Sequence, residues 1–139
     1  MGFFDIEVIA KAKPLQIIEN PQLIGEHLKK RRLQLRLLQA DVANMFAVCE
    51  DSITGWENGR SEPQIQYYPK IIQFLGYNPF PVNTETLGGR IHKYRIEHGL
   101  SHKKFGKLIG IDASTIRSWE DNHTTPGHIN LRKIKEFIN

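Results

Sequence analysis

The sequence predicts an all-α protein built from two tandem copies of one small helical domain. Residues 22–76 align with residues 85–139 without a gap, and 11 of the 55 aligned pairs are identical. An Ile-x-x-Trp-Glu segment lies at residues 53–57 and again 63 positions later, at residues 116–120. Its isoleucine, tryptophan and glutamate fall at i, i+3 and i+4, which places them on one face of a helix. We therefore assign both tryptophans to the core and expect the outer face of each helix to recognise a partner.

Composition and charge fit this architecture. A chain of 139 residues with 40% hydrophobic and 24% charged residues is ordinary for a soluble globular protein of one domain or two small ones. The net charge of +4 mildly favours an acidic partner such as nucleic acid. The single cysteine, Cys49, excludes an internal disulfide and fits a reducing compartment. Without a signal peptide or a membrane-spanning run, a cytoplasmic, nucleoid-associated protein is expected.

The amino-terminal residues 1–21 stand apart from the repeat. Apolar residues from Phe4 to Val8 alternate with Asp5 and Glu7, and this period of two suggests a short strand or an extended arm. A packing strand or a tail is favoured over a basic arm that contacts DNA.

Three further boundaries follow from the repeat. The first domain covers residues 22–76, a stiff linker with two prolines covers residues 77–84, and the second domain covers residues 85–139. Each domain is expected to contain five short helices. The second helix is predicted at about residues 39–46 and 102–109, and two further short helices close each copy.

A charged pair is predicted inside each copy. Arg32 and Arg95 lie in line with the apolar stripe of the first helix, and Glu57 and Glu120 lie on the inner face of the third. Because an unpaired buried charge is costly, we expect Arg32 to pair with Glu57 and Arg95 with Glu120. These four residues are assigned to the scaffold.

Helix ends are better specified in the second copy than in the first. Ser101 is a good N-cap for the second helix, Gly110 can adopt a left-handed conformation in the turn, and Asp112 can cap the third helix. The first copy has the weaker choices Ala47 and Cys49 in the last two of these positions.

A small residue, a tight turn and then Ile-x-x-Trp-Glu on a third helix resemble the Cro/C1-type, or Xre, helix-turn-helix family. Residues 38–43 and 52–60 carry the pattern in the first copy, and residues 100–106 and 115–120 carry it in the second. The resemblance implies two lambda-repressor-like five-helix domains that bind double-stranded DNA, each with its third helix in the major groove and without a cofactor.

The resemblance makes three places candidate DNA contacts: the start of the second helix, the outer face of the third helix and the loop after it. In the second copy these residues are His102, Ala113, Ser114, Arg117, Ser118, Asn122 and His123. In the first copy they are Gln39, Glu50, Asp51, Thr54, Gly55, Asn58 and Arg60. Arg117 is the strongest candidate, because a guanidinium matches the O6 and N7 acceptors of guanine.

The two copies differ in charge. Residues 86–139 hold ten Lys/Arg and five Asp/Glu, a net of +5, whereas residues 22–79 hold seven and six, a net of +1. Because phosphate contacts dominate affinity for DNA, the second copy is expected to be the stronger reader and the first a weaker or more selective one.

The sequence thus indicates a sequence-specific double-stranded DNA-binding protein, a transcription regulator of the prokaryotic kind that acts as a monomer or homodimer. The alternative is a protein-interaction module, antitoxin-like or partner-binding, that retains the helix-turn-helix fold. An enzyme is not expected, because no paired acidic residues at catalytic spacing, phosphate-cradling glycine loop or nucleophile elbow is found. No Cys/His set has the spacing of a metal site.

Overall fold

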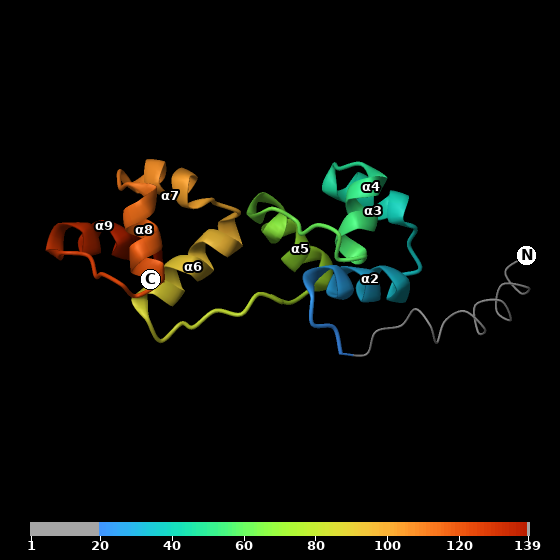
Figure 1. The fold of residues 1–139 in the computed structure, drawn as a ribbon, viewed down its shortest axis with the longest axis horizontal. Coiled ribbons are helices and arrows are strands. Elements are labelled where there is room, and N and C mark those ends of the chain that lie inside the picture. The colour runs from blue at the N-terminus through green and yellow to red at the C-terminus, as the bar shows by residue number, and fades with distance from the viewer. Residues whose placement is uncertain (1–19, 139) are drawn as a thin grey trace, which may run out of the picture. The chain divides into compact units, whose positions relative to one another are not determined.

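The computed structural model describes residues 20–138, and every regular element within this range is a helix (Figure 1). The predicted all-α class is therefore confirmed for this part of the chain. The arm expected at residues 1–21 lies, apart from its last two residues, outside the described range. No helix among residues 20–138 is long and apolar enough to cross a membrane.

The described residues divide into two compact units, with the boundary between Glu62 and Pro63. The described helices of the first unit are α2 (Ile24–Gln34), α3 (Gln39–Phe46) and α4 (Glu50–Glu57). The helices of the second unit are the 3-10 helix η2 (Ile65–Tyr67), α5 (Tyr68–Leu75), α6 (Leu87–His98), α7 (His102–Ile109), α8 (Ala113–Glu120) and α9 (His128–Ile138).

Helices η2 and α5 pack against α6 within the second unit. The sequence repeat groups the same two helices with the first copy instead, as its closing segment. The domain boundaries at residues 22–76, 77–84 and 85–139 therefore stay a prediction.

In the first unit, α4 packs against both α2 and α3. Phe46 and Trp56 meet edge to face with ring centroids 6.2 Å apart. Ile53 and Trp56 are buried, as the inner-face assignment predicted. The buried apolar residues of these three helices are Leu28, Val42, Ala43, Phe46, Ile53 and Trp56.

In the second unit, α8 packs against α6 and α7, and α9 packs against α6. Trp119 is buried with Ile116 on the inner face of α8, so its assignment to the core is confirmed. The buried cluster consists of Ile91, Phe105, Ile109, Ile116, Trp119 and Ile134.

The helix ends follow the predicted difference between the copies. Ser101 and Asp112 each accept a hydrogen bond from a backbone N–H in the first turn of α7 and α8. Gly110 ends α7 in the left-handed region, with φ of 74°. Ala47 ends α3 in the same region with φ of 57°, and Cys49 provides no side-chain cap for α4. The first copy therefore forms the same turn from residues less suited to it.

The closing segment of the second copy differs from the expectation of two short helices, because residues 128–138 form one helix, α9. In the first copy Pro69 lies in the first turn of α5, and η2 precedes it as a separate element. Proline is favoured in a first turn but disrupts a helix interior. The aligned residue in the second copy is Arg132, which lets α9 continue without interruption.

Candidate nucleic-acid interface

Both predicted ion pairs are present and buried. Arg32 donates through Nε and Nη2 to Oε2 and Oε1 of Glu57, at 2.7 and 2.9 Å. Arg95 binds Glu120 through the same atoms at 2.5 and 2.8 Å. In each copy, Nη1 of the arginine donates to the backbone carbonyl five residues further along the chain, at 3.0 and 2.9 Å. This bidentate pair joins the first helix of each copy to the third and fixes the position of the third helix.

The residues at the start of the second helix are tied to these glutamates. Gln39 donates through Nε2 to Glu57 Oε1 at 3.0 Å, and its own Oε1 accepts from the Thr54 hydroxyl at 2.8 Å. In the second copy, His102 Nε2 lies 3.3 Å from Glu120 Oε1. The sequence predicted Gln39 and His102 as DNA contacts but gave no signal for these bonds, because they join residues 15 or 18 positions apart.

The pKa of His102 is held below its ordinary value. Partial burial disfavours the imidazolium, the nearby Arg95 adds to this effect, and Glu120 opposes it. A neutral His102 can therefore donate through Nε2 to Glu120 while Nδ1 stays an acceptor.

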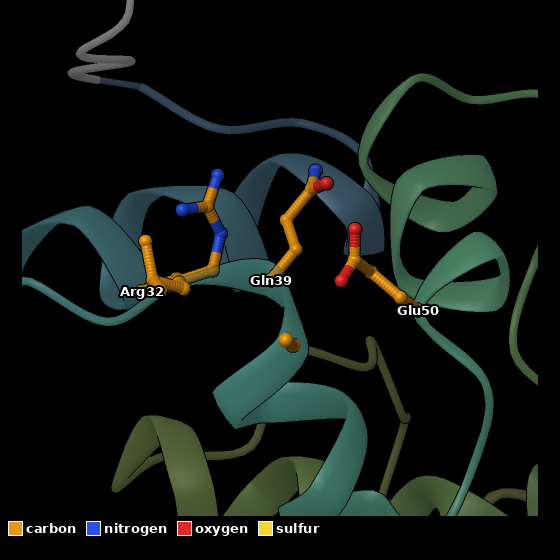
Figure 2. A pocket seen from close by; sticks show the side chains of 5 residues that line it. Arg32, Gln39 and Glu50 are labelled. Atoms are coloured by element: carbon orange, nitrogen blue, oxygen red, sulfur yellow. The ribbon is translucent and has the colours of Figure 1, made fainter.

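A pocket of about 350 Å³ opens where α2, α3 and α4 meet in the first unit. Figure 2 shows the Gln39 amide between the side chains of Arg32 and Glu50. Because Arg32 is neutralised by Glu57, the pocket presents an amide and the exposed carboxylate of Glu50 rather than a free cation.

On the outer face of α8, Arg117 is exposed and makes no hydrogen bond or ion pair with any described residue. The serines beside it are engaged within the chain: the Ser114 hydroxyl donates to Asp112, and the Ser118 hydroxyl lies 2.7 Å from that of Thr124. The hydrogen bonds from Ser114 lower the pKa of Asp112, which keeps this cap ionised. Arg117 is therefore the outward side chain of α8 with all its donors available.

The other candidates of the second copy lie around Arg117. Ala113 is half-buried at the start of α8, whereas Asn122 and His123 are exposed in the loop after it. Asn122 adopts a positive φ of 60°, a conformation that asparagine tolerates better than most residues. The loop therefore carries polar groups next to the outer face of α8.

The outer face of α4 has a different composition. Glu50, Asp51 and Asn58 are exposed, and Arg60 reaches back from the following loop to Asp51, with Nη2 3.1 Å from Oδ1. Gly55, which the sequence placed among the outward residues, is instead buried. The Arg60 side chain covers it, so the exposed group at this point is a guanidinium rather than glycine backbone.

Among the described residues, no group of three or more His, Cys, Asp or Glu side chains could hold a metal ion. The arrangement offers hydrogen-bond donors and acceptors on a helix face, which suits recognition of base edges and phosphates.

A comparison with family models identifies a helix-turn-helix at residues 91–139, the region that contains α7 and α8. The predicted resemblance is confirmed for these residues, and the matched family is one of DNA-binding, non-enzymatic domains. The match does not extend to the first copy. No curated protein and no solved structure matches the chain.

Proposed function

We propose that this protein binds double-stranded DNA sequence-specifically through two tandem helix-turn-helix domains and acts as a transcription regulator of the prokaryotic kind. The observation that carries the proposal is the position of Arg117. It is exposed and unpaired among the described residues, on the third helix of the segment that matches a helix-turn-helix family. Such a helix enters the major groove, where a guanidinium can bind guanine bidentately.

Two observations support a second reading domain in the first copy. Helices α2, α3 and α4 begin at residues 24, 39 and 50, and α6, α7 and α8 begin 63 positions later, at residues 87, 102 and 113. Both copies also carry the same bidentate arginine–glutamate pair between first and third helices. A single chain would then cover two half-sites.

The first experiment compares two charge reversals. Arg117→Glu removes the proposed base contact and adds a repulsive charge, whereas Thr54→Glu adds a charge at the aligned position of the first copy. Arg117→Glu should weaken binding to a preferred duplex for two reasons. Loss of the base contact costs about 1–3 kcal/mol, and the added carboxylate is repelled by phosphate. Thr54→Glu should have a much smaller effect. Fluorescence anisotropy over a range of salt concentrations measures both, and equal losses would contradict a dominant second copy.

One observation favours the alternative of a protein-interaction module. Leu38 and Met45 are 68% and 53% exposed in the first unit, where Glu50 and Asp51 also face solvent. An apolar and acidic surface suits a protein partner better than DNA. Weak DNA binding without sequence preference, together with a stable complex with one protein partner, would favour this function.

A further inference from the structure

The loop after α4 folds back over the outer face of that helix. The carbonyl of Gly55 accepts hydrogen bonds from the backbone N–H groups of Arg60 and Ser61, at 2.9 and 3.2 Å. The Arg60 side chain continues across the helix, and its Nη2 donates to Asp51 at Oδ1 (3.1 Å) and at the backbone carbonyl (3.3 Å). A Cβ atom at position 55 would lie 3.0 Å from Arg60 Nη2. The same Cβ atom would lie 2.9 Å from Ser61 Oγ, so the absence of a side chain at Gly55 makes room for the guanidinium and for the Ser61 hydroxyl.

The aligned loop of the second copy has the same backbone turn but different side chains. The carbonyl of Ser118 accepts from the N–H groups of His123 and Thr124, at 2.9 and 3.4 Å. The space left open at Gly55 is occupied there by the Ser118 hydroxyl, which is bonded to Thr124. No arginine extends from this loop, because residue 123 is a histidine.

Four aligned positions differ between the two copies. Asp51, Thr54, Gly55 and Arg60 in the first copy correspond to Ser114, Arg117, Ser118 and His123 in the second. Each set contains one arginine at the outer face of the third helix. In the second copy this arginine is Arg117, which belongs to the helix itself. In the first copy it is Arg60, which belongs to the loop after the helix and lies over Gly55.

We propose that Arg60 is the base-reading side chain of the first copy and that Asp51 is the residue that positions it, with a guanine edge in the major groove as the ligand. This inference rests on the proposed function. Within residues 20–138, Arg60 Nε and Nη1 donate no hydrogen bond, so Nη1 keeps its donors for the guanine edge while Nη2 holds Asp51.

The pairing also explains how an acidic residue is tolerated on a surface that contacts DNA. Asp51 is 82% exposed and Arg60 is 58% exposed, so the pair is weak in free protein and biases the guanidinium rather than locking it. Against DNA, the carboxylate is neutralised by its own partner. Removal of the Asp51 carboxylate should therefore reduce discrimination between bases. If Asp51 acted only through its negative charge, its removal would instead strengthen binding to DNA, which is a polyanion.

The test is selection from a random duplex pool with the full chain, followed by affinity measurements on the enriched duplex and on duplexes with single base changes. Arg60→Ala should abolish the preference for guanine at one position of one half-site, a loss of about 5- to 150-fold in discrimination. Asp51→Ala should reduce the same preference about 2- to 5-fold without weakening binding to unselected duplex. Asp51→Asn, which keeps an acceptor oxygen, should retain more of the guanine preference than Asp51→Ala does.

Glu62→Gln is the matched control, because Glu62 is exposed in the same loop and has no bond to Arg60. It removes one negative charge and should leave the guanine preference unchanged. A uniform loss over all sequences in Arg60→Ala, with a salt slope reduced by about one, would identify a phosphate contact and overturn the inference. So would tighter binding with unchanged base preference in Asp51→Ala. Absence of enrichment with wild-type protein would instead overturn the proposed function itself.

Discussion

At the scale of single residues, the buried arginine–glutamate pairs hold the third helix of each copy in place. The side chains of Arg95 and Glu120 are only 6% and 9% exposed, and those of Arg32 and Glu57 are 11% and 1% exposed. A buried pair adds little net stability, but loss of one partner leaves an uncompensated charge. The pairs therefore make the third helix intolerant of change at its inner glutamate.

Glu120→Ala should lower the free energy of unfolding by about 3–5 kcal/mol, because it leaves the Arg95 guanidinium buried and unpaired. Glu97→Ala is the control, since Glu97 also pairs with a cation, Lys93, but at 3.7 Å and 45% exposed. It should lower the free energy of unfolding by no more than about 1 kcal/mol. Urea denaturation measures both, and similar losses would contradict the structural role of the buried pair.

His102 makes stability depend on pH. Its folded pKa lies below the ordinary value of 6.5, mainly because the ring is partly buried. Below about pH 6.5 the unfolded chain takes up a proton that the folded chain does not, so the free energy of unfolding falls as pH falls. Above that pH the contribution is fully present.

His102→Gln should flatten this pH dependence, because glutamine cannot titrate and Gln39 already makes the equivalent bond to its glutamate in the first copy. Thermal unfolding between pH 7.5 and 5.5 measures the effect. Some dependence should remain from His92, whose pKa is also lowered by burial. A pH dependence identical to wild type would show that His102 does not titrate differently on folding.

Residue pairs were predictable where a charge interrupts an apolar stripe, as with Arg32 and Arg95. The bonds of Gln39, His102 and Arg60 were not, because a polar residue on a polar surface has many partners within reach. The partner that each of these residues binds depends on how separate helices approach each other and on loop conformation. The periodicity of the sequence encodes neither.

At the scale of elements, the contact between the first and third helices of each copy is unusually close. An added Cβ at Gly88 would lie 2.4 Å from the backbone carbonyl oxygen of Trp119, and one at Gly25 would lie 1.7 Å from that of Trp56. Both are shorter than any tolerable contact with backbone. Glycine at these aligned positions therefore sets the distance between the first and third helices.

Gly88→Ala should destabilise the protein by about 1–3 kcal/mol through overpacking, although alanine favours a helix more than glycine does. Gly127→Ala is the control, because nothing lies within 4 Å of a Cβ at that position. It should change stability by less than about 0.5 kcal/mol. Thermal or urea unfolding compares the two variants. Unchanged stability in Gly88→Ala would mean that the helices can separate without penalty.

The ends of helices were predictable where the sequence contains capping residues and turn residues. The second helix of each copy begins and ends at the predicted residues, 39–46 and 102–109. The alignment of the two copies shows the shared glycine at Gly25 and Gly88. It does not show their close contacts with the third helix, because the spacing of residues along one helix does not determine its distance from another helix. The expectation of two closing helices was wrong for α9, where the proline in the first turn of α5 has no counterpart.

At the scale of the whole molecule, the two aligned segments differ in net charge and in the arginine at the outer face of the third helix. The second copy combines a net charge of +5 with the unpaired Arg117, which suits affinity for phosphate and direct base contact. The first copy has a net charge of +1 and an arginine restrained by an acid, which suits selectivity more than affinity. The asymmetry of charge was predictable from the sequence, whereas the restraint on Arg60 required the structure.

The most direct test of the account is selection of bound sequences from a random duplex pool with wild-type protein, followed by affinity against salt for the enriched duplex. Two tandem reading domains predict two recurring half-sites in each selected sequence, and binding that persists at physiological salt. A single recurring half-site would show that the first copy does not read bases. No enrichment, with binding lost by physiological salt, would contradict sequence-specific DNA binding altogether.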